Sequence, residues 1–236
     1  MESSVTDLTK ERVDPSQEHQ LEGNTPLEGN IPLEAKVYGW VIYQLTITTI
    51  IAALIYIYPQ AVLMPLFWVS LGIAIMCILV FGCYLIQVHT PFIIRFLVFN
   101  LFTLSMSYML GVGVSGVDTR ILLVCALTTM IIFVVLSAIV WKLRLNLIHW
   151  GTFLFSTLTA ILIVGFVQIF VPFPSIVSII VSVISILLFC GYILYDTSRL
   201  LNRQGNIDPL WIAMGLYIDI LNLFLQLVKL VQTFKS

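Results

Sequence analysis

The chain has 236 residues, of which 60% are hydrophobic and only 10% are charged, and its formal net charge is −1. A single soluble core could not enclose so many apolar side chains, so the composition excludes a soluble globular domain. It predicts a polytopic integral membrane protein whose main partner is the lipid bilayer. No cluster of basic residues is interleaved with aromatic residues, and we therefore expect no nucleic-acid partner.

The first 36 residues differ in composition from the rest of the chain. They hold eight of the 12 acidic residues and contain no aromatic residue. Such a polar, acidic composition is typical of a disordered segment. We expect residues 1–36 to form a disordered acidic tail in the cytoplasm and residues 37–236 to form the membrane domain.

From residue 37 onward, apolar stretches follow one another, each long enough to cross a hydrocarbon core about 30 Å thick. The predicted spans are 37–58, 62–86, 92–114, 119–141, 147–171, 176–198 and 210–231. The expected fold is therefore all-α, a bundle of seven transmembrane helices. With a cytoplasmic N-terminus, five basic residues beside the predicted spans fall on the cytoplasmic side: Lys36, Lys142, Arg144, Arg199 and Arg203. The opposite loops hold none except Arg120, in agreement with the positive-inside rule.

Two aspartates, Asp196 and Asp219, lie inside the last two predicted spans. An ionisable side chain at membrane depth costs roughly 2.5–3.5 kcal/mol on insertion scales, which makes it a candidate functional group. Both residues are about eleven positions from the centre of the predicted turn at 205–209. An antiparallel hairpin folded about that centre would place them side by side, about one helical turn inside the membrane.

Two carboxyls so close together cannot both ionise cheaply, so we expect them to share a proton over some pH range. Such a pair can act as a latch, bridged by a proton when closed and bridged by a cation or separated when ionised. Asn222 follows Asp219 on a polar stripe, and Tyr192 precedes Asp196 on a seam of the other helix. With these neighbours the aspartates would bind Ca²⁺ only weakly, as conduction requires. Helix packing alone is the alternative interpretation of both stripes.

The segments around the two aspartates, Phe189–Thr197 and Leu216–Phe224, resemble the paired-aspartate motif of the Bax-inhibitor / lifeguard (transmembrane Bax inhibitor motif) family. Lys36–Gly39 and Phe102–Gly111 resemble that family's first and third helices. The resemblance implies a Ca²⁺ leak channel of the Golgi or endoplasmic reticulum that lowers store Ca²⁺ and inhibits apoptosis. It also implies that the aspartate pair is a pH-sensitive gate. The protein would not be an enzyme and would need no cofactor, and its partners could include other membrane proteins of apoptosis or Ca²⁺ handling.

Two positions depart from the family's pattern. Met106 stands where many members carry a glutamate in the third helix, and the basic residue common near the end of the second helix has no clean counterpart in Gln87-Val88-His89. If a cation normally holds the aspartate pair shut, His89 or Arg95 would have to take that role. Both are therefore candidate gating cations, and an interfacial position without a gating role is the alternative for His89.

Three other interpretations stay open from the sequence. A diaspartyl intramembrane protease also needs two aspartates that share a proton, but Gly215-Leu216-Tyr217-Ile218-Asp219 departs from the Gly-x-Gly-Asp pattern of that class. A seven-helix receptor would explain the helix count but not the two acids in the last hairpin. A non-conducting membrane scaffold that regulates apoptosis through partners is compatible with the whole sequence.

Overall fold

The computed structural model describes residues 32–57, 60–84, 90–171, 173–202 and 208–235. Within these residues, seven helices are long and apolar enough to cross a membrane, which confirms the predicted all-α, seven-helix fold. They are α2 (Leu33–Tyr56), α3 (Gln60–Tyr84), α4 (Phe92–Gly113), α5 (Thr119–Leu143), α6 (Gly151–Phe170), α7 (Ser175–Leu201) and α8 (Pro209–Lys235), with a short 3-10 helix η1 (Ile148–Trp150) before α6.

The first helix begins earlier than predicted. The sequence placed the start of the first span at residue 37, whereas α2 begins at Leu33, directly after Pro32. Glu34 lies in the first turn, where a negative charge interacts favourably with the helix dipole. The prediction of a disordered tail falls largely on residues 1–31, which lie outside the described residues.

Prolines and one polar cap set several of the other helix ends. Pro91 and Pro174 directly precede α4 and α7. Proline is common at this position because its ring would clash with a preceding helical turn. The side chain of Asp118 caps α5 by accepting a hydrogen bond from the backbone N–H of Arg120 at 2.9 Å. The same helix ends at Leu143, and the residue that follows and caps it, Arg144, has a left-handed backbone with φ of 49°.

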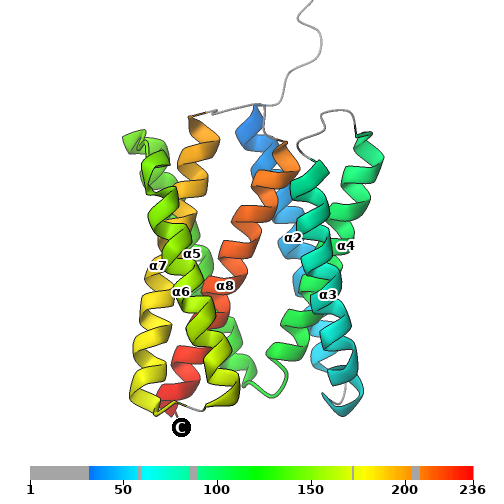
Figure 1. Ribbon diagram of the computed structural model, residues 1–236, viewed down its shortest axis with the longest axis vertical. Helices are drawn as coiled ribbons and strands as arrows, with labels where there is room; N and C mark the ends of the chain where they lie inside the picture. The colour runs from blue at the N-terminus through cyan, green and yellow to red at the C-terminus, as the bar shows by residue number, and fades with distance from the viewer. Residues whose placement is uncertain (1–31, 58–59, 85–89, 172, 203–207, 236) are drawn as a thin grey trace, which may run out of the picture. The chain divides into compact units, whose positions relative to one another are not determined.

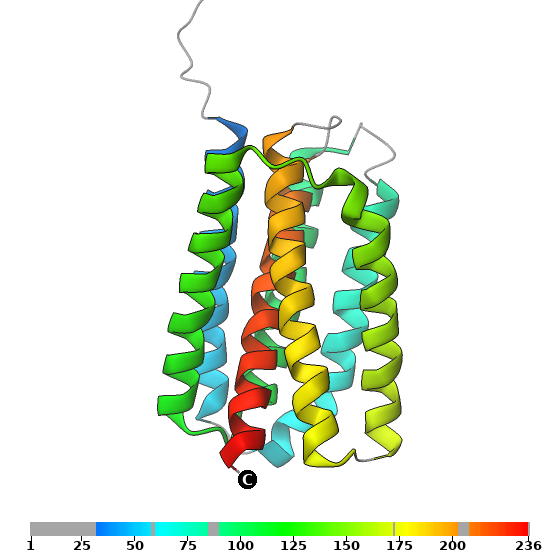
Figure 2. The ribbon, with the colours of Figure 1, turned by 90° about the vertical axis from the view of Figure 1, so that its left-hand side faces the viewer.

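Successive helices run in opposite directions (Figure 1). We call one end of the bundle the Asp208 end, because α7 finishes and α8 starts there, and the opposite end the Asp118 end, because α5 starts and α8 finishes there. The helix α8 is the most buried of the seven and contacts α2, α4, α5 and α7. The helix α7 lies between α5 and α6 (Figure 2). The last helix of the chain is therefore the core of the bundle.

A buried network of hydroxyl and amide groups joins α2, α4 and α8. The Tyr217 hydroxyl lies 2.7 Å from Thr48 Oγ1, and Ser107 Oγ donates to the same threonine oxygen at 2.9 Å. Nearer the Asp208 end, Gln44 Nε2 donates to Thr103 Oγ1 at 3.0 Å. All five side chains are buried. Because a membrane offers these groups no water, the network fixes how the three helices pack against one another.

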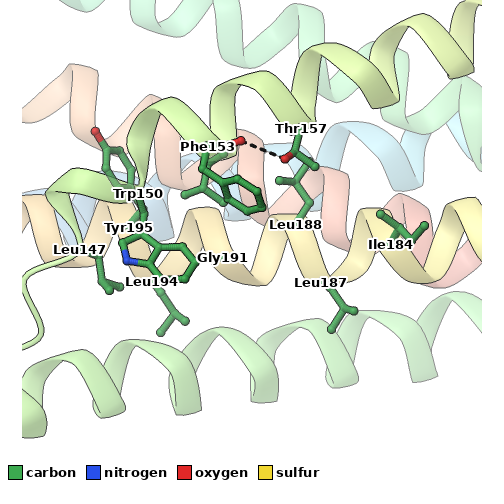
Figure 3. A pocket seen from close by; sticks show the side chains of 11 residues that line it. Leu147, Trp150, Phe153, Thr157, Ile184, Leu187, Leu188, Gly191, Leu194 and Tyr195 are labelled. Atoms are coloured by element: carbon green, nitrogen blue, oxygen red, sulfur yellow. Dashed lines mark hydrogen bonds between the residues drawn. The ribbon is translucent and has the colours of Figure 1, made fainter.

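The outer surface of the bundle is apolar, and it carries grooves between neighbouring helices. Side chains of η1, α6 and α7 enclose a cavity of about 380 Å³ that runs along both helices, from Trp150 and Tyr195 at one end to Ile184 at the other (Figure 3). Its lining is almost wholly apolar, and Gly191 of α7 forms part of it. The groove follows from the position of α6, which packs mainly against α7 alone.

Candidate functional site

Asp196 lies on α7, five residues before that helix ends at Leu201, and its side chain reaches the backbone of α8. A Cβ atom placed on Gly215 of α8 would be only 2.6 Å from Asp196 Oδ2. Real Cβ atoms essentially never make so short a contact. The glycine therefore provides the space that lets the carboxylate of α7 rest directly against α8.

Asp219 lies four residues further along α8 and is only 5% exposed. Its Oδ2 atom is buried and has no hydrogen-bond partner within the described part of the chain. The carboxyl interacts electrostatically with Asp196, and the Tyr192 hydroxyl interacts with both carboxyls. Burying a carboxyl oxygen without a hydrogen-bond donor is energetically costly. A proton or a cation bound to the carboxyl would lower that cost.

The register of the hairpin differs from the one predicted. The sequence-based centre lay at 205–209 and placed the two aspartates level with each other, whereas Asp196 is level with Gly215, one turn before Asp219. The reason is that the helix ends set the centre: α7 stops at Leu201 and α8 starts at Pro209, so the midpoint is residue 205.

The direction of the two side chains compensates for the offset of about one turn between the backbone positions of Asp196 and Asp219. In an α-helix the Cα–Cβ bonds tilt toward the N-terminus, and α7 and α8 are antiparallel. Asp196 therefore leans toward the Asp118 end, and Asp219 leans toward the Asp208 end. The two side chains converge between their backbone levels, and Tyr192 is opposite Asp219 in the same register.

Asp196 also lines a small cavity toward the Asp208 end. The cavity has a volume of about 170 Å³ and lies between α3, α7 and α8, with Arg199, Gly215 and Ile218 among its lining residues. Arg199 stands one helical turn beyond Asp196 on α7 and interacts with it electrostatically. Arg199 therefore shares both a helix face and this cavity with Asp196.

The candidate gating cations named from the sequence have other positions. Arg95, in the first turn of α4, forms a salt bridge with Asp208 rather than with the aspartate pair. Asp208 is buried and also caps α8, because its Oδ1 accepts from the backbone N–H of Leu210 at 2.9 Å. The bridge thus ties α4 to the start of α8. His89 lies outside the described residues.

The polar stripe on α8 continues from Asp219 toward the Asp118 end. Asn222 Nδ2 donates to the backbone oxygen of Ile218 at 3.0 Å, so part of its amide serves its own helix. Further along, Lys229 Nζ donates to Gln168 Oε1 of α6 at 2.9 Å. The stripe therefore faces the α6–α7 side of the bundle.

The donor set around the aspartates is small. Within the residues that the structure describes, no group of three or more His, Cys, Asp and Glu side chains could hold a metal ion. Two carboxyls alone fall short of the six to eight oxygens that Ca²⁺ prefers, and water would have to supply the remainder.

Two residues of this site were not identified from the sequence as site residues. Gly215 precedes Asp219 by four positions, and Arg199 follows Asp196 by three, so both lie on the same helix face as the nearby aspartate. A search for small and oppositely charged residues one turn from each acid would have found them.

The chain matches the protein family described as "Inhibitor of apoptosis-promoting Bax1" over residues 33–236. It is 29% identical to Protein LIFEGUARD 4 of Arabidopsis thaliana over 204 residues, which cover 83% of this chain and 82% of the relative. It is 31% identical to Protein lifeguard 4 of Mus musculus over 207 residues, 84% of this chain and 83% of the relative. A Golgi anti-apoptotic protein of Vaccinia virus is 30% identical over 131 residues, covering 56% of this chain and 55% of the relative.

Proposed function

The chain belongs to the Bax inhibitor-1 family of multi-pass membrane proteins, and from this we propose that it is a pH-sensitive Ca²⁺ leak channel of an intracellular membrane. By lowering store Ca²⁺ it would restrain apoptosis, the activity after which the family and the Vaccinia relative are named. The observation that carries the proposal is the carboxyl of Asp219 in the core helix: its buried Oδ2 has no hydrogen-bond partner among the described residues, and it interacts electrostatically with a second carboxyl, that of Asp196.

The gate would be the contact between α7 and α8. When one proton is shared by the two carboxyls, Asp196 rests on Gly215 and the helices stay closed at this level. When both carboxyls are ionised, repulsion separates them unless a cation enters between them. Ca²⁺ would then pass the pair as a transient ligand, and Arg199 would compete with it for Asp196.

The orientation follows from the basic residues. Lys36, Arg95, Lys142, Arg144 and Arg199 all lie toward the Asp208 end of the bundle. By the positive-inside rule this end would face the cytoplasm and the Asp118 end would face the lumen. The small cavity beside Asp196 would then be the cytoplasmic approach to the gate. The name of the Vaccinia relative favours the Golgi as the membrane, with the endoplasmic reticulum as the alternative.

The test is Ca²⁺ flux across the membrane of liposomes that contain the purified protein. The flux is measured from about pH 5 to about pH 8 in steps of about one pH unit. We expect a leak that depends on pH, and we expect Asp196→Asn or Asp219→Asn to change both its rate and its pH profile. Asp118→Asn is the matched control, since it removes a carboxyl at a helix cap where asparagine is equally suitable. A flux that is flat with pH and indifferent to both substitutions would refute the channel proposal.

A non-conducting scaffold is the second candidate, and the groove between α6 and α7 favours it (Figure 3). An apolar groove of about 380 Å³ facing the bilayer could receive a side of another transmembrane helix. Protection against apoptosis that persists in a variant without measurable flux would support this candidate over the channel.

A further inference from the structure

A second polar cluster lies between α6, α7 and α8, closer to the Asp118 end than the aspartates. We call it the Lys229 cluster, and it consists of Gln168, Ser182, Gln226 and Lys229. Gln226 and Lys229 continue the helical stripe that begins at Asp219, and ten residues of α-helix place Lys229 about 15 Å from the level of Asp219. The nitrogen of Lys229 and the oxygen of Gln168 are 2.9 Å apart, which brings α6 into the cluster.

Ser182 belongs to the same level of the bundle. Asp196 contacts Gly215, and both Ser182 and Lys229 are fourteen residues from that contact, one along each antiparallel helix. Ser182 is on the α7 seam that faces α8 and has no exposed surface. The antiparallel register therefore makes Ser182 level with Lys229.

The cluster is rich in buried polar atoms that lack partners. Gln168 Nε2, Ser182 Oγ and Gln226 Oε1 have no hydrogen-bond partner among the residues that the structure describes. Buried polar groups in native proteins are nearly always bonded to protein or to water. Three buried polar atoms without a protein partner make this level of the bundle more polar than its surroundings and suited to a hydrated ion.

Lys229 gives this level a positive charge. Its ammonium group donates to a neutral amide and forms no salt bridge with a described residue, whereas the acid at this end, Asp118, lies 3.8 Å from Lys235. The charge of Lys229 is therefore not neutralised by a neighbouring carboxylate. A cation that has passed Asp219 along the stripe must next approach a fixed positive charge.

We propose that Lys229 is an electrostatic barrier at the exit of the ion path, which slows divalent cations more than monovalent ones. This inference rests on the proposed leak function and adds a charge-selective element to it. The energy of an ion near a fixed charge is proportional to the charge of the ion. The barrier energy for Ca²⁺ is therefore twice that for K⁺. Because the rate depends exponentially on this energy, the factor by which Lys229 slows Ca²⁺ is the square of the factor for K⁺.

The magnitude follows from Coulomb's law. For an ion that passes about 8 Å from the ammonium group in water, removal of the charge speeds a monovalent ion about 2.4-fold and a divalent ion about sixfold. A lower effective dielectric in the bundle would increase both factors but would keep their square relation.

The experiment measures K⁺ and Ca²⁺ flux in liposomes for the wild type, Lys229→Gln, Lys229→Arg and Lys235→Gln at low ionic strength. Lys229→Gln should raise Ca²⁺ flux about sixfold and K⁺ flux about 2.4-fold, and Lys229→Arg should keep both near wild type. Lys235→Gln removes the same charge from the same helix at a side chain that is 68% exposed and already lies 3.8 Å from the carboxylate of Asp118, so it should change both fluxes less than Lys229→Gln does. A melting curve for each variant in detergent identifies any variant that fails to fold. Lys229→Arg keeps the positive charge and changes only the side chain, so it separates the effect of the charge from the effect of the side-chain shape.

The outcomes separate the two proposals. A wild-type flux that Lys229→Gln leaves unchanged, or raises equally for both ions, overturns the barrier and leaves the leak intact. An equal increase in Lys235→Gln also overturns it, because the effect would then come from surface charge. Absence of flux in the wild type refutes the proposed leak itself and the barrier with it.

Discussion

Replacement of Gly215 by alanine is the most selective perturbation of the aspartate pair. The added methyl group would lie 2.6 Å from Asp196 Oδ2, and 3.4 Å is the lower limit of ordinary contact. The oxygen must therefore retreat by about 0.8 Å from α8. The next atom met is Asp196 Cγ at 3.6 Å, which needs no adjustment, so the change acts on the end of one side chain.

This substitution should leave the fold intact. Alanine is favoured over glycine inside a helix by roughly 0.5–1 kcal/mol, which offsets the cost of moving the carboxylate. The proposed latch, in contrast, is weakened, because the Asp196 carboxylate can no longer rest against α8 at this position. If the displacement removes about 1 kcal/mol from a charge-assisted hydrogen bond of about 1.5–3 kcal/mol, the open fraction rises about fivefold.

Two measurements check this prediction. Ca²⁺ flux in liposomes should increase about fivefold at the pH where the wild type is most closed, and the melting temperature in detergent should change by only a few degrees. Gly165→Ala is the matched control, because a Cβ on this α6 glycine would meet no atom within 4 Å. Gly215→Ala with the flux and pH profile of the wild type would show that the contact with α8 does not hold the gate closed.

Two further predictions concern contacts that hold α8 in the bundle. Tyr217→Phe and Thr48→Val should each destabilise the protein, because each removes one partner of a buried 2.7 Å contact. A double-mutant cycle in a denaturant titration should give a coupling free energy of about 0.6–1.7 kcal/mol. A coupling near zero would show that the contact contributes nothing to stability. Arg95→Gln should cost about 1–2 kcal/mol in the same assay, because it leaves the buried Asp208 unpaired although water already screens an arginine that is 36% exposed. Asp208→Asn added to Arg95→Gln should recover most of that loss, since asparagine still caps α8, and a double variant as weak as the single one would contradict this account.

The fold was predictable from the sequence because the membrane imposes a simple rule. Each span needs about 20 apolar residues, and the predicted limits of the third span, 92–114, differ from α4 by one residue at its end. The start of the first span was less accurate. Residues 33–36 are polar enough to read as tail, but a helix can begin in the interfacial region before its apolar part, as α2 does at Leu33.

The register of the aspartates could not be predicted in the same way. The predicted centre of the hairpin lay in the polar turn at 205–209, from which the two acids are almost equally distant. Only the helix ends, Leu201 and Pro209, fix the true centre, and nothing in an apolar pattern marks them to within one turn. Arg95 was misjudged for a related reason, because its partner Asp208 is more than a hundred positions away in the chain.

The charged residues of the α7–α8 seam form an ordered series in the structure. From the Asp208 end, the series begins with Arg199, continues with Asp196 and Asp219, and ends with Lys229. Two negative charges with a positive charge on either side attract a divalent ion at the centre and repel it at both ends. Attraction that is limited in this way prevents tight retention, and conduction requires the ion to leave as well as to enter. In the proposed channel, loss of an aspartate would therefore remove the site that attracts Ca²⁺ and forms the latch. Loss of a flanking cation would lower a barrier and leave the latch in place.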